Sequence, residues 1–266
     1  MSDTQHDDPW AELGKTYVDT HYGSLRGRVR THVIHQHLLA HLAPAPLRIV
    51  DVGGGAGHQS IPLARAGYDI TIVDPSPFML ERAAQQIRLE APEVATRVRL
   101  VEANGEDAPA VLEGQRFGGV LCHGVVMYLD DPTALVTALC TLVDEDGIVS
   151  IAAKNLDVMA IRPALVGDWA GALAGFDLDR QINGLGADTR GDTIHGLSAR
   201  LAANGLEPEA WYGVRLFTDG WTRAQPPPDD EDLVLAVELV ASRRDPYRQL
   251  SRLFHLVARR HSPDLP

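Results

Sequence analysis

The chain has 266 residues, of which 45% are hydrophobic and 23% are charged, and this composition excludes collagen-like, disordered and coiled-coil proteins. Its 36 acidic and 24 basic side chains give a formal charge of −12, which excludes a protein that holds nucleic acids by bulk positive charge. A chain of this length can bury a substantial core, so we expect one domain over residues 1–266. The two cysteines, Cys122 and Cys140, predict no disulfide framework, and the sequence carries no evident export or membrane-spanning segment, so we expect a cytoplasmic protein without a membrane partner.

Apolar segments with strand and helix periodicity alternate along the first 155 residues. Helical spacing over residues 13–41 predicts an N-terminal helical cover within residues 1–45, which ends at Ala43-Pro44-Ala45-Pro46. Short β-branched runs predict strands at 47–52, 68–74, 98–103, 118–124 and 147–155, and the patterns between them predict helices at 58–67, 77–90, 107–113 and 131–143. This alternation is typical of an α/β fold with a mainly parallel sheet covered by helices on both faces.

The remaining third of the chain has a different organisation. Residues 155–190 form a mixed insertion after the fifth strand, where α/β folds place specificity. A helix is predicted at 193–204, a further apolar pattern at 231–243, and strands near 209–218 and at 254–260. We expect these two strands to pair with each other, which would place an antiparallel strand at the edge of a seven-stranded sheet.

A glycine-rich turn follows the first predicted strand. Gly53-Gly54-Gly55-Ala56-Gly57 stands between this strand and the helix at 58–67, and glycines permit positive φ angles and close approach of a ligand to the backbone. The turn fits neither the dinucleotide pattern G-x-G-x-x-G nor the phosphate-binding pattern that ends in Gly-Lys-Ser/Thr. Asp74 ends the next strand, where a carboxylate can accept hydrogen bonds from ribose hydroxyls.

Together with Asp51, the turn resembles the first motif of the class I S-adenosylmethionine (SAM)-dependent methyltransferases, which have a Rossmann-like seven-stranded sheet. The segments VEANGEDAP (101–109) and LCHGVVMYLDDP (121–132) are similar to later segments of that family, in the same order. The resemblance implies SAM as cofactor, with contacts from the residues that occupy these motifs: Asp51, Gly53, Gly54, Gly55, Asp74, Asn104, Gly105, Glu106 and His123.

A closer resemblance covers most of the chain. YGSLRGRVR (22–30), GVRLFTD (213–219) and DPYRQLSRLFHLVARR (245–260) are similar to the bacterial tRNA carboxymethoxyuridine methyltransferases. This implies a tRNA partner, methyl-ester formation on the modified wobble uridine, and pairing of Arg30 with the carboxylate of SAM. The insertion differs from that group because residues 175–192 lack its run of lysines, so the basic patch expected for tRNA is missing from this segment.

The acceptor and the catalytic residues stay open at this stage. A carboxylate acceptor needs a cation that orients it, for which Arg215 is a candidate beside Tyr128, with Arg248 and Tyr22 as further possibilities. A hydroxyl or amine acceptor needs a base, for which His123 is the first candidate, although a ring that only packs on the cofactor is the favoured interpretation. A small-molecule O-methyltransferase acting on a carboxylate or phenol, and a SAM-binding protein without turnover, are the alternative functions.

A tryptophan and a group of histidines are two further candidates for binding or metal coordination. Trp169, in the insertion, is a candidate for the acceptor pocket. The histidines at 32, 35, 37 and 41 stand on a predicted helix without a cysteine or carboxylate among them, so we predict no metal site there. The sequence does not indicate the oligomeric state.

Overall fold

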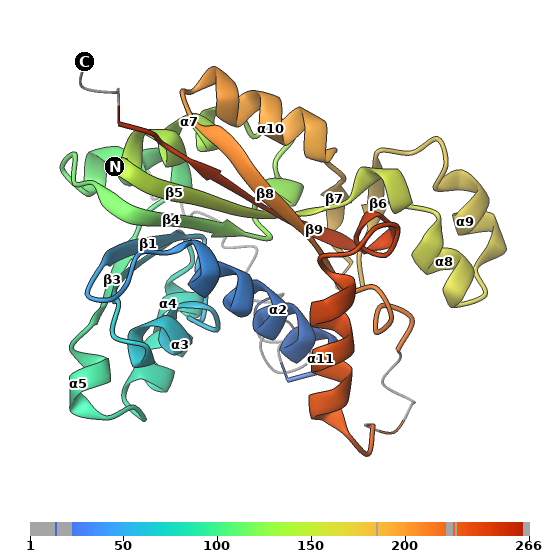
Figure 1. Cartoon of the computed structure of the whole chain (residues 1–266), viewed down its shortest axis with the longest axis horizontal. Coiled ribbons are helices and arrows are strands. Elements are labelled where there is room, and N and C mark those ends of the chain that lie inside the picture. The colour runs from blue at the N-terminus through green and yellow to red at the C-terminus, as the bar shows by residue number, and fades with distance from the viewer. Residues whose placement is uncertain (1–13, 15–22, 185, 222–225, 227, 263–266) are drawn as a thin grey trace, which may run out of the picture.

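A seven-stranded sheet forms the centre of the computed structural model, which describes residues 14, 23–184, 186–221, 226 and 228–262 (Figure 1). The strand order is β3-β2-β1-β4-β5-β9-β8, and the first five strands of the chain pair in parallel, as predicted. The seven strands of the sheet are β1 (Arg48–Val52), β2 (Asp69–Asp74), β3 (Val98–Glu102), β4 (Phe117–His123), β5 (Val143–Lys154), β8 (Glu207–Val214) and β9 (Leu253–Arg259).

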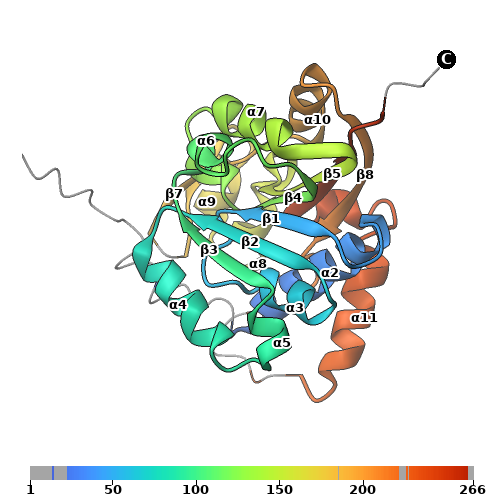
Figure 2. The same cartoon turned by 90° about the vertical axis from the view of Figure 1, so that its left-hand side faces the viewer.

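Helices cover both faces of this sheet, as Figures 1 and 2 show. One face carries α2 (Leu25–His41), α3 (Ser60–Arg65), α4 (Pro77–Ile87), α5 (Pro92–Ala95) and α11 (Glu231–Ala241), and the other carries α6 (Ala108–Val111), α7 (Thr133–Leu142) and α10 (Ile194–Ala203). The short helix predicted at 107–113 is found as α6, and a 3-10 turn, Gly105–Asp107, precedes it. Of the predicted N-terminal cover, α2 is described, whereas residues 1–13 and 15–22, and Tyr22 among them, lie outside the described residues.

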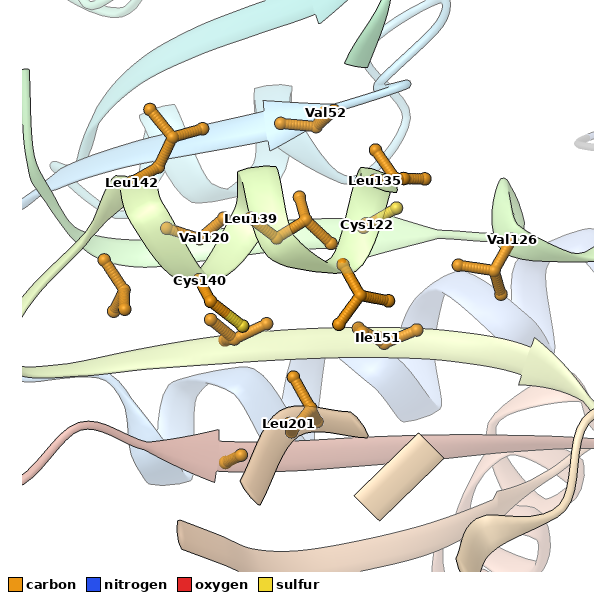
Figure 3. Packing of buried hydrophobic residues seen from close by; sticks show 14 of the residues in the cluster. Val52, Val120, Cys122, Val126, Leu135, Leu139, Cys140, Leu142, Ile151 and Leu201 are labelled. Carbon is orange, nitrogen blue, oxygen red and sulfur yellow. The ribbon is translucent and has the colours of Figure 1, made fainter. Parts of the chain in front are cut away.

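The strands divide their side chains between two buried clusters because successive residues of a strand point to opposite faces. In β4, Val120 and Cys122 face the cluster under α7 and α10, whereas Leu121 faces the cluster under α2 and α3. Figure 3 shows Leu135 and Leu139 of α7 in the same cluster as Val120 and Cys122. The apolar runs in the sequence therefore mark strands that are buried on both faces, and both cysteines lie free in the core.

The last two strands pair antiparallel with each other at one edge of the seven-stranded sheet, as predicted, and the structure shows which of them is the outer strand. β9 does pair antiparallel with β8, but it also pairs antiparallel with β5, so β9 lies inside the sheet and β8 forms its edge. Six consecutive residues of β9, Leu253–Ala258, are buried, whereas the first six residues of β8 are exposed or only partly buried. A strand that is apolar on both faces is stable only where neighbours cover it, which explains why the later strand takes the inner place.

The insertion after β5 forms a small substructure of its own. It contains α8 (Ile161–Leu165), α9 (Trp169–Ala174) and a two-stranded antiparallel sheet of β6 (Arg180–Ile182) and β7 (Asp188–Arg190). Figure 1 shows that α8 and α9 project beyond the end of the central sheet. Within the described part of the chain, no helix combines the length and the apolar character that crossing a bilayer requires.

The packing of α7 on the sheet gives a stability prediction. Leu139 is fully buried in the cluster of Figure 3, so Leu139→Ala removes apolar contacts and leaves a cavity. We expect a loss of about 2–5 kcal/mol in the free energy of unfolding, measured by chemical denaturation. Leu89→Ala is the matched control because Leu89 is 78% exposed, and its effect should stay within about 0.5 kcal/mol. Equal stability of the two variants would contradict this account of the core.

Candidate active site

A cavity of about 240 Å³ opens at the carboxyl ends of four neighbouring parallel strands. Its wall includes Gly53 after β1, Asp74 at the end of β2, Asn104 after β3 and His123 at the end of β4. Apolar side chains complete it, among them Val52, Met79, Val125, Leu129 and Leu135. In open α/β sheets, ligands bind outside the carboxyl ends of the strands, so this is where a small ligand is expected.

The glycine turn forms one side of this cavity because only glycine fits there. Gly53 and Gly55 have φ angles of 72° and 55°, in the left-handed region. A Cβ atom on Gly53 would lie 2.3 Å from a methyl carbon of Val125, and one on Gly55 would lie 2.8 Å from the terminal carbon of Met79. The backbone therefore reaches the cavity without side chains that would fill it.

Asp74 fixes the turn to the neighbouring strand. Its Oδ2 accepts a hydrogen bond from the backbone N–H of Gly55 at 2.9 Å, and its Oδ1 accepts one from the N–H of Ser76 at 3.0 Å. The carboxylate is 6% exposed and lines the cavity. Two backbone donors thus set the orientation of a buried carboxylate beside the glycine turn.

Asp51 and Gly54 lie behind the cavity wall. Asp51 is buried, its Oδ2 accepts a hydrogen bond from the Ser60 hydroxyl at 2.7 Å, and burial raises its pKa to about 6. A Cβ atom on Gly54 would meet this carboxyl group at 2.8 Å. Neither residue is part of the cavity lining, so the geometry gives them the role of supporting the turn from below.

The segment after β3 forms the opposite wall. Asn104, Gly105 and Glu106 all line the cavity, as the motif resemblance implies for ligand contacts. A Cβ atom on Gly105 would lie 2.6 Å from Leu135 and 2.8 Å from Val52, so the chain can pass between these two side chains only as glycine. The carboxylate of Glu106 and the amide of Asn104 are the polar groups of this wall.

His123 is held by hydrogen bonds inside the sheet. Its Nε2 lies 2.9 Å from the Ser150 hydroxyl, which lies 2.6 Å from Nε2 of His255 on β9. Burial lowers the pKa of His123 to about 3, and the positive charge of Arg30 acts in the same direction. A neutral imidazole with so low a pKa is a weak proton acceptor, so the geometry favours a packing role over that of a general base.

A second cavity of about 670 Å³ adjoins the first, and Gly124 and Tyr128 line both. Its wall comes from α2, from the insertion and from the ends of β5, β8 and β9. Among the described residues, its basic lining side chains outnumber the carboxylates seven to two: Arg26, Arg30, Lys154, Arg162, Arg180, Arg215 and Arg252 face Asp168 and Asp188. The cavity is therefore cationic although the whole chain is acidic.

Besides Tyr128, this second cavity contains two further predicted site residues, Arg30 and Arg215. Arg30 is 4% exposed and its Nη2 donates to the backbone carbonyl of His123 at 2.9 Å, which puts it at the border of the two cavities, in the lining of the larger one. Arg215 is buried in the larger cavity with a φ of 65° and forms an ion pair with Asp219. The predicted pairing of Arg30 with the cofactor carboxylate stays a prediction.

Two expectations about the acceptor side need correction. Trp169 is 72% exposed and is not part of the lining, because α9 faces the cavity with Asp168, Gly171 and Ala174 instead. Segment 175–192 contains no run of basic residues, but the fold brings basic residues from distant parts of the sequence together in a basic patch. Arg248 is not part of it, since it pairs with Asp245 and stacks on Trp211 at a separate surface groove.

Lys154 and Arg252 are site residues that sequence reasoning missed. Lys154 ends the buried strand β5 and is 2% exposed, and Arg252 directly precedes the buried strand β9. The only sign of them in the sequence was a basic residue at one end of an apolar strand. Its meaning depended on the antiparallel placement of β9 beside β5, which brings the start of one strand to the end of the other.

The chain is similar in sequence to known methyltransferases. Residues 50–151 match the family described as a methyltransferase domain. The chain is 26% identical, over 98% of its length and 97% of the relative's, to the tRNA 5-carboxymethoxyuridine methyltransferase of Escherichia coli. It is 31% identical to a ubiquinone biosynthesis O-methyltransferase of Methylobacterium nodulans, over 60% of this chain and 69% of that protein.

A solved structure supports the fold. Magnesium protoporphyrin IX methyltransferase from Synechocystis PCC 6803 with bound SAH superposes with a TM-score of 0.64 at 16% identity, covering 94% of this chain and 96% of that one. The predicted Rossmann-like sheet of the class I methyltransferases is thereby confirmed. With its glycine turn, its four-strand cavity and these relatives, the chain belongs to the family of S-adenosylmethionine-dependent methyltransferases.

Proposed function

We propose that the protein methylates the carboxylate of 5-carboxymethoxyuridine in tRNA, with SAM as methyl donor, and forms a methyl ester. The observation that carries this proposal is the similarity over nearly the whole chain to the Escherichia coli tRNA enzyme. That match includes the insertion and the C-terminal strands, which build the acceptor side, and not only the cofactor-binding half. The cationic cavity beside the cofactor cavity supports an acceptor that carries negative charge.

The residues of the smaller cavity fit the cofactor. A buried, oriented carboxylate at Asp74 suits the ribose hydroxyls, and the apolar walls with Asn104 and Glu106 suit the adenine and its neighbourhood. The bare backbone at Gly53 and Gly55 allows the ligand to approach closely. His123 is neutral, so it adds no positive charge beside a cationic sulfonium group.

The chain's own residues would bind and orient the acceptor in the larger cavity. When bound, SAM would supply a methyl carbon that a carboxylate oxygen can attack directly, with the sulfur leaving as part of S-adenosylhomocysteine. A carboxylate has no proton to lose, so no proton acceptor is needed. Tyr128 and Gly124 belong to both cavities, which supports their shared border as the place where donor and acceptor would meet. Alignment of the two reactants in a pocket screened from water is the main contribution that such a site makes.

A small-molecule O-methyltransferase is the second candidate function. The similarity to ubiquinone biosynthesis O-methyltransferases favours it, because the match to the Methylobacterium nodulans protein is higher in identity, although it covers less of the chain. A phenol acceptor needs a base, however, and the low pKa of His123 makes this residue unsuitable for that role. An acidic small molecule fits the cationic cavity better than a phenol does.

The first prediction concerns the cofactor. Asp74→Ala removes charge-assisted hydrogen bonds, so we expect SAM affinity to fall by about 2–3 kcal/mol, or about 30- to 150-fold, in isothermal titration. Asp69→Ala is the matched control at the other end of β2, where Asp69 pairs with Arg97 on the surface. It should leave the affinity unchanged. Unaltered SAM binding by Asp74→Ala would remove Asp74 from the cofactor site.

The second prediction concerns the acceptor. Tritium from methyl-labelled SAM should enter tRNA from a strain that lacks this protein, and mild alkali should release it because methyl esters hydrolyse under those conditions. tRNA from the parent strain, already esterified, serves as the control and should take up little label. If SAM binds but no label enters the tRNA, the tRNA proposal fails and acidic small molecules become the acceptors to test.

A further inference from the structure

Three neighbouring strands each place one basic residue at the same end of the sheet, where all three residues line the larger cavity. Lys154 ends β5 and pairs in register with Leu253 of β9, which pairs in turn with Val214 of β8. Arg252 precedes Leu253, Arg215 follows Val214, and the backbone N–H of Arg252 donates to the carbonyl of Arg215 at 3.1 Å. The sheet itself therefore brings these three cations together, and all three line the cavity.

The positive charge of this group exceeds the negative charge that faces it. Asp219 forms an ion pair with Arg215 and another with Arg162 at 3.6 Å, and its charge also acts on Arg252. One carboxylate thus serves three guanidinium groups, and Asp188, whose charge acts on Lys154, is itself paired with Arg180 at 2.7 Å. Lys154 has no carboxylate in hydrogen-bond contact among the described residues, since its ammonium group donates to the carbonyl and hydroxyl oxygens of Thr189 at 3.2 and 3.0 Å.

Two donor atoms of the group lack a partner within the described part of the chain. Nη1 of Arg252 and Nε of Arg215 are buried and make no hydrogen bond there. The other end of the Arg252 guanidinium makes only a long contact of 3.5 Å with the side-chain oxygen of Gln181. Buried donors in a cationic cavity are costly unless an acceptor reaches them, and an anion supplies both the acceptor oxygens and the missing charge.

From this arrangement we infer that Lys154, Arg215 and Arg252 form an anion-binding subsite that holds the negatively charged group of the methyl acceptor. A carboxylate or a phosphate of the acceptor fits the planar fork of Arg252 and the point charge of Lys154. This inference deepens the proposed function and rests on it for the identity of the acceptor, but the subsite itself requires only an anionic ligand. Lys154 and Arg252 act as specificity-determining residues, because they select a charged acceptor over its neutral analogue.

The test measures binding of small probes to the whole protein saturated with S-adenosylhomocysteine. The probes are 5-carboxymethoxyuridine nucleoside, its methyl ester, uridine and uridine 5′-monophosphate, compared by isothermal titration. We expect a charged probe to bind at least 10-fold more tightly than its neutral counterpart. This difference should disappear in Lys154→Met and in Arg252→Met, while Arg88→Met, which removes an exposed arginine paired with Glu81, should retain it.

Each outcome of this comparison has a defined meaning. Preference for the carboxymethoxy nucleoside over its ester assigns the subsite to the acceptor carboxylate, and preference for the monophosphate over uridine assigns it to a phosphate. The inference would be overturned if Lys154→Met and Arg252→Met lowered the affinity for charged and for neutral probes by the same factor. It would also be overturned if they lowered the affinity for S-adenosylhomocysteine as much as the affinity for the charged probes. If anion binding depends on these residues but tRNA takes up no label, the subsite stands and the tRNA proposal alone fails.

The pH dependence of binding gives a second readout. Burial, together with the positive charges of Arg252 and Arg180, lowers the pKa of Lys154 to about 7, although the negative charge of Asp188 acts in the opposite direction. An anion binds the protonated form, so its affinity is highest below about pH 7 and should fall as the pH rises through this value. Lys154→Arg keeps the charge at all these pH values and should bind the anion without that decline. A wild-type affinity that is flat between pH 6 and 9 would contradict the role of Lys154.

Discussion

The hydrogen bond from the backbone N–H of Gly55 to Asp74 is the contact on which the shape of the smaller cavity depends. It joins the turn after β1 to the end of β2, and the N–H of Gly53 adds a bond of 2.7 Å to the carbonyl of Val73. These bonds hold the glycine turn open toward the cavity. The turn tolerates this because its glycines accept positive φ angles and have no side chains in the way. A carboxylate that serves the turn and also lines the cavity couples the local fold to the binding of a ligand.

Charge is distributed unevenly in this molecule. The formal charge of −12 acts at long range and repels polyanions, whereas the larger cavity presents a local excess of basic side chains. Long-range repulsion is screened at physiological salt within about 8 Å, so the local cavity decides what binds once a ligand has arrived. An acidic protein can therefore favour an anionic acceptor without being a general nucleic-acid binder, because selection depends on a few desolvated cations.

The antiparallel strand β9 links the two halves of the site. Because it runs between β5 and β8, its first residues stand at the edge where the parallel strands end. Arg252 thereby comes beside Lys154, although the two are almost a hundred positions apart in the chain. If β9 were the edge strand instead of β8, Lys154 would lie next to β8, and the residues that the cavity now combines would be separated.

The sequence by itself determined the helix and strand alternation, the parallel half of the sheet and most of the residues that line the smaller cavity. These features depend on local signals: β-branched runs, a glycine turn, and polar residues directly after strands at Asp74, Asn104 and His123. Residues that follow neighbouring parallel strands must meet at one edge, so their proximity could be predicted without coordinates.

Only the tertiary structure decided the inner place of β9, the outward position of Trp169 and the composition of the larger, cationic cavity. The reason is that burial on both faces, the pairing of distant strands and the sharing of one carboxylate by several arginines depend on long-range packing, and no periodicity in a single sequence records which distant segments become neighbours.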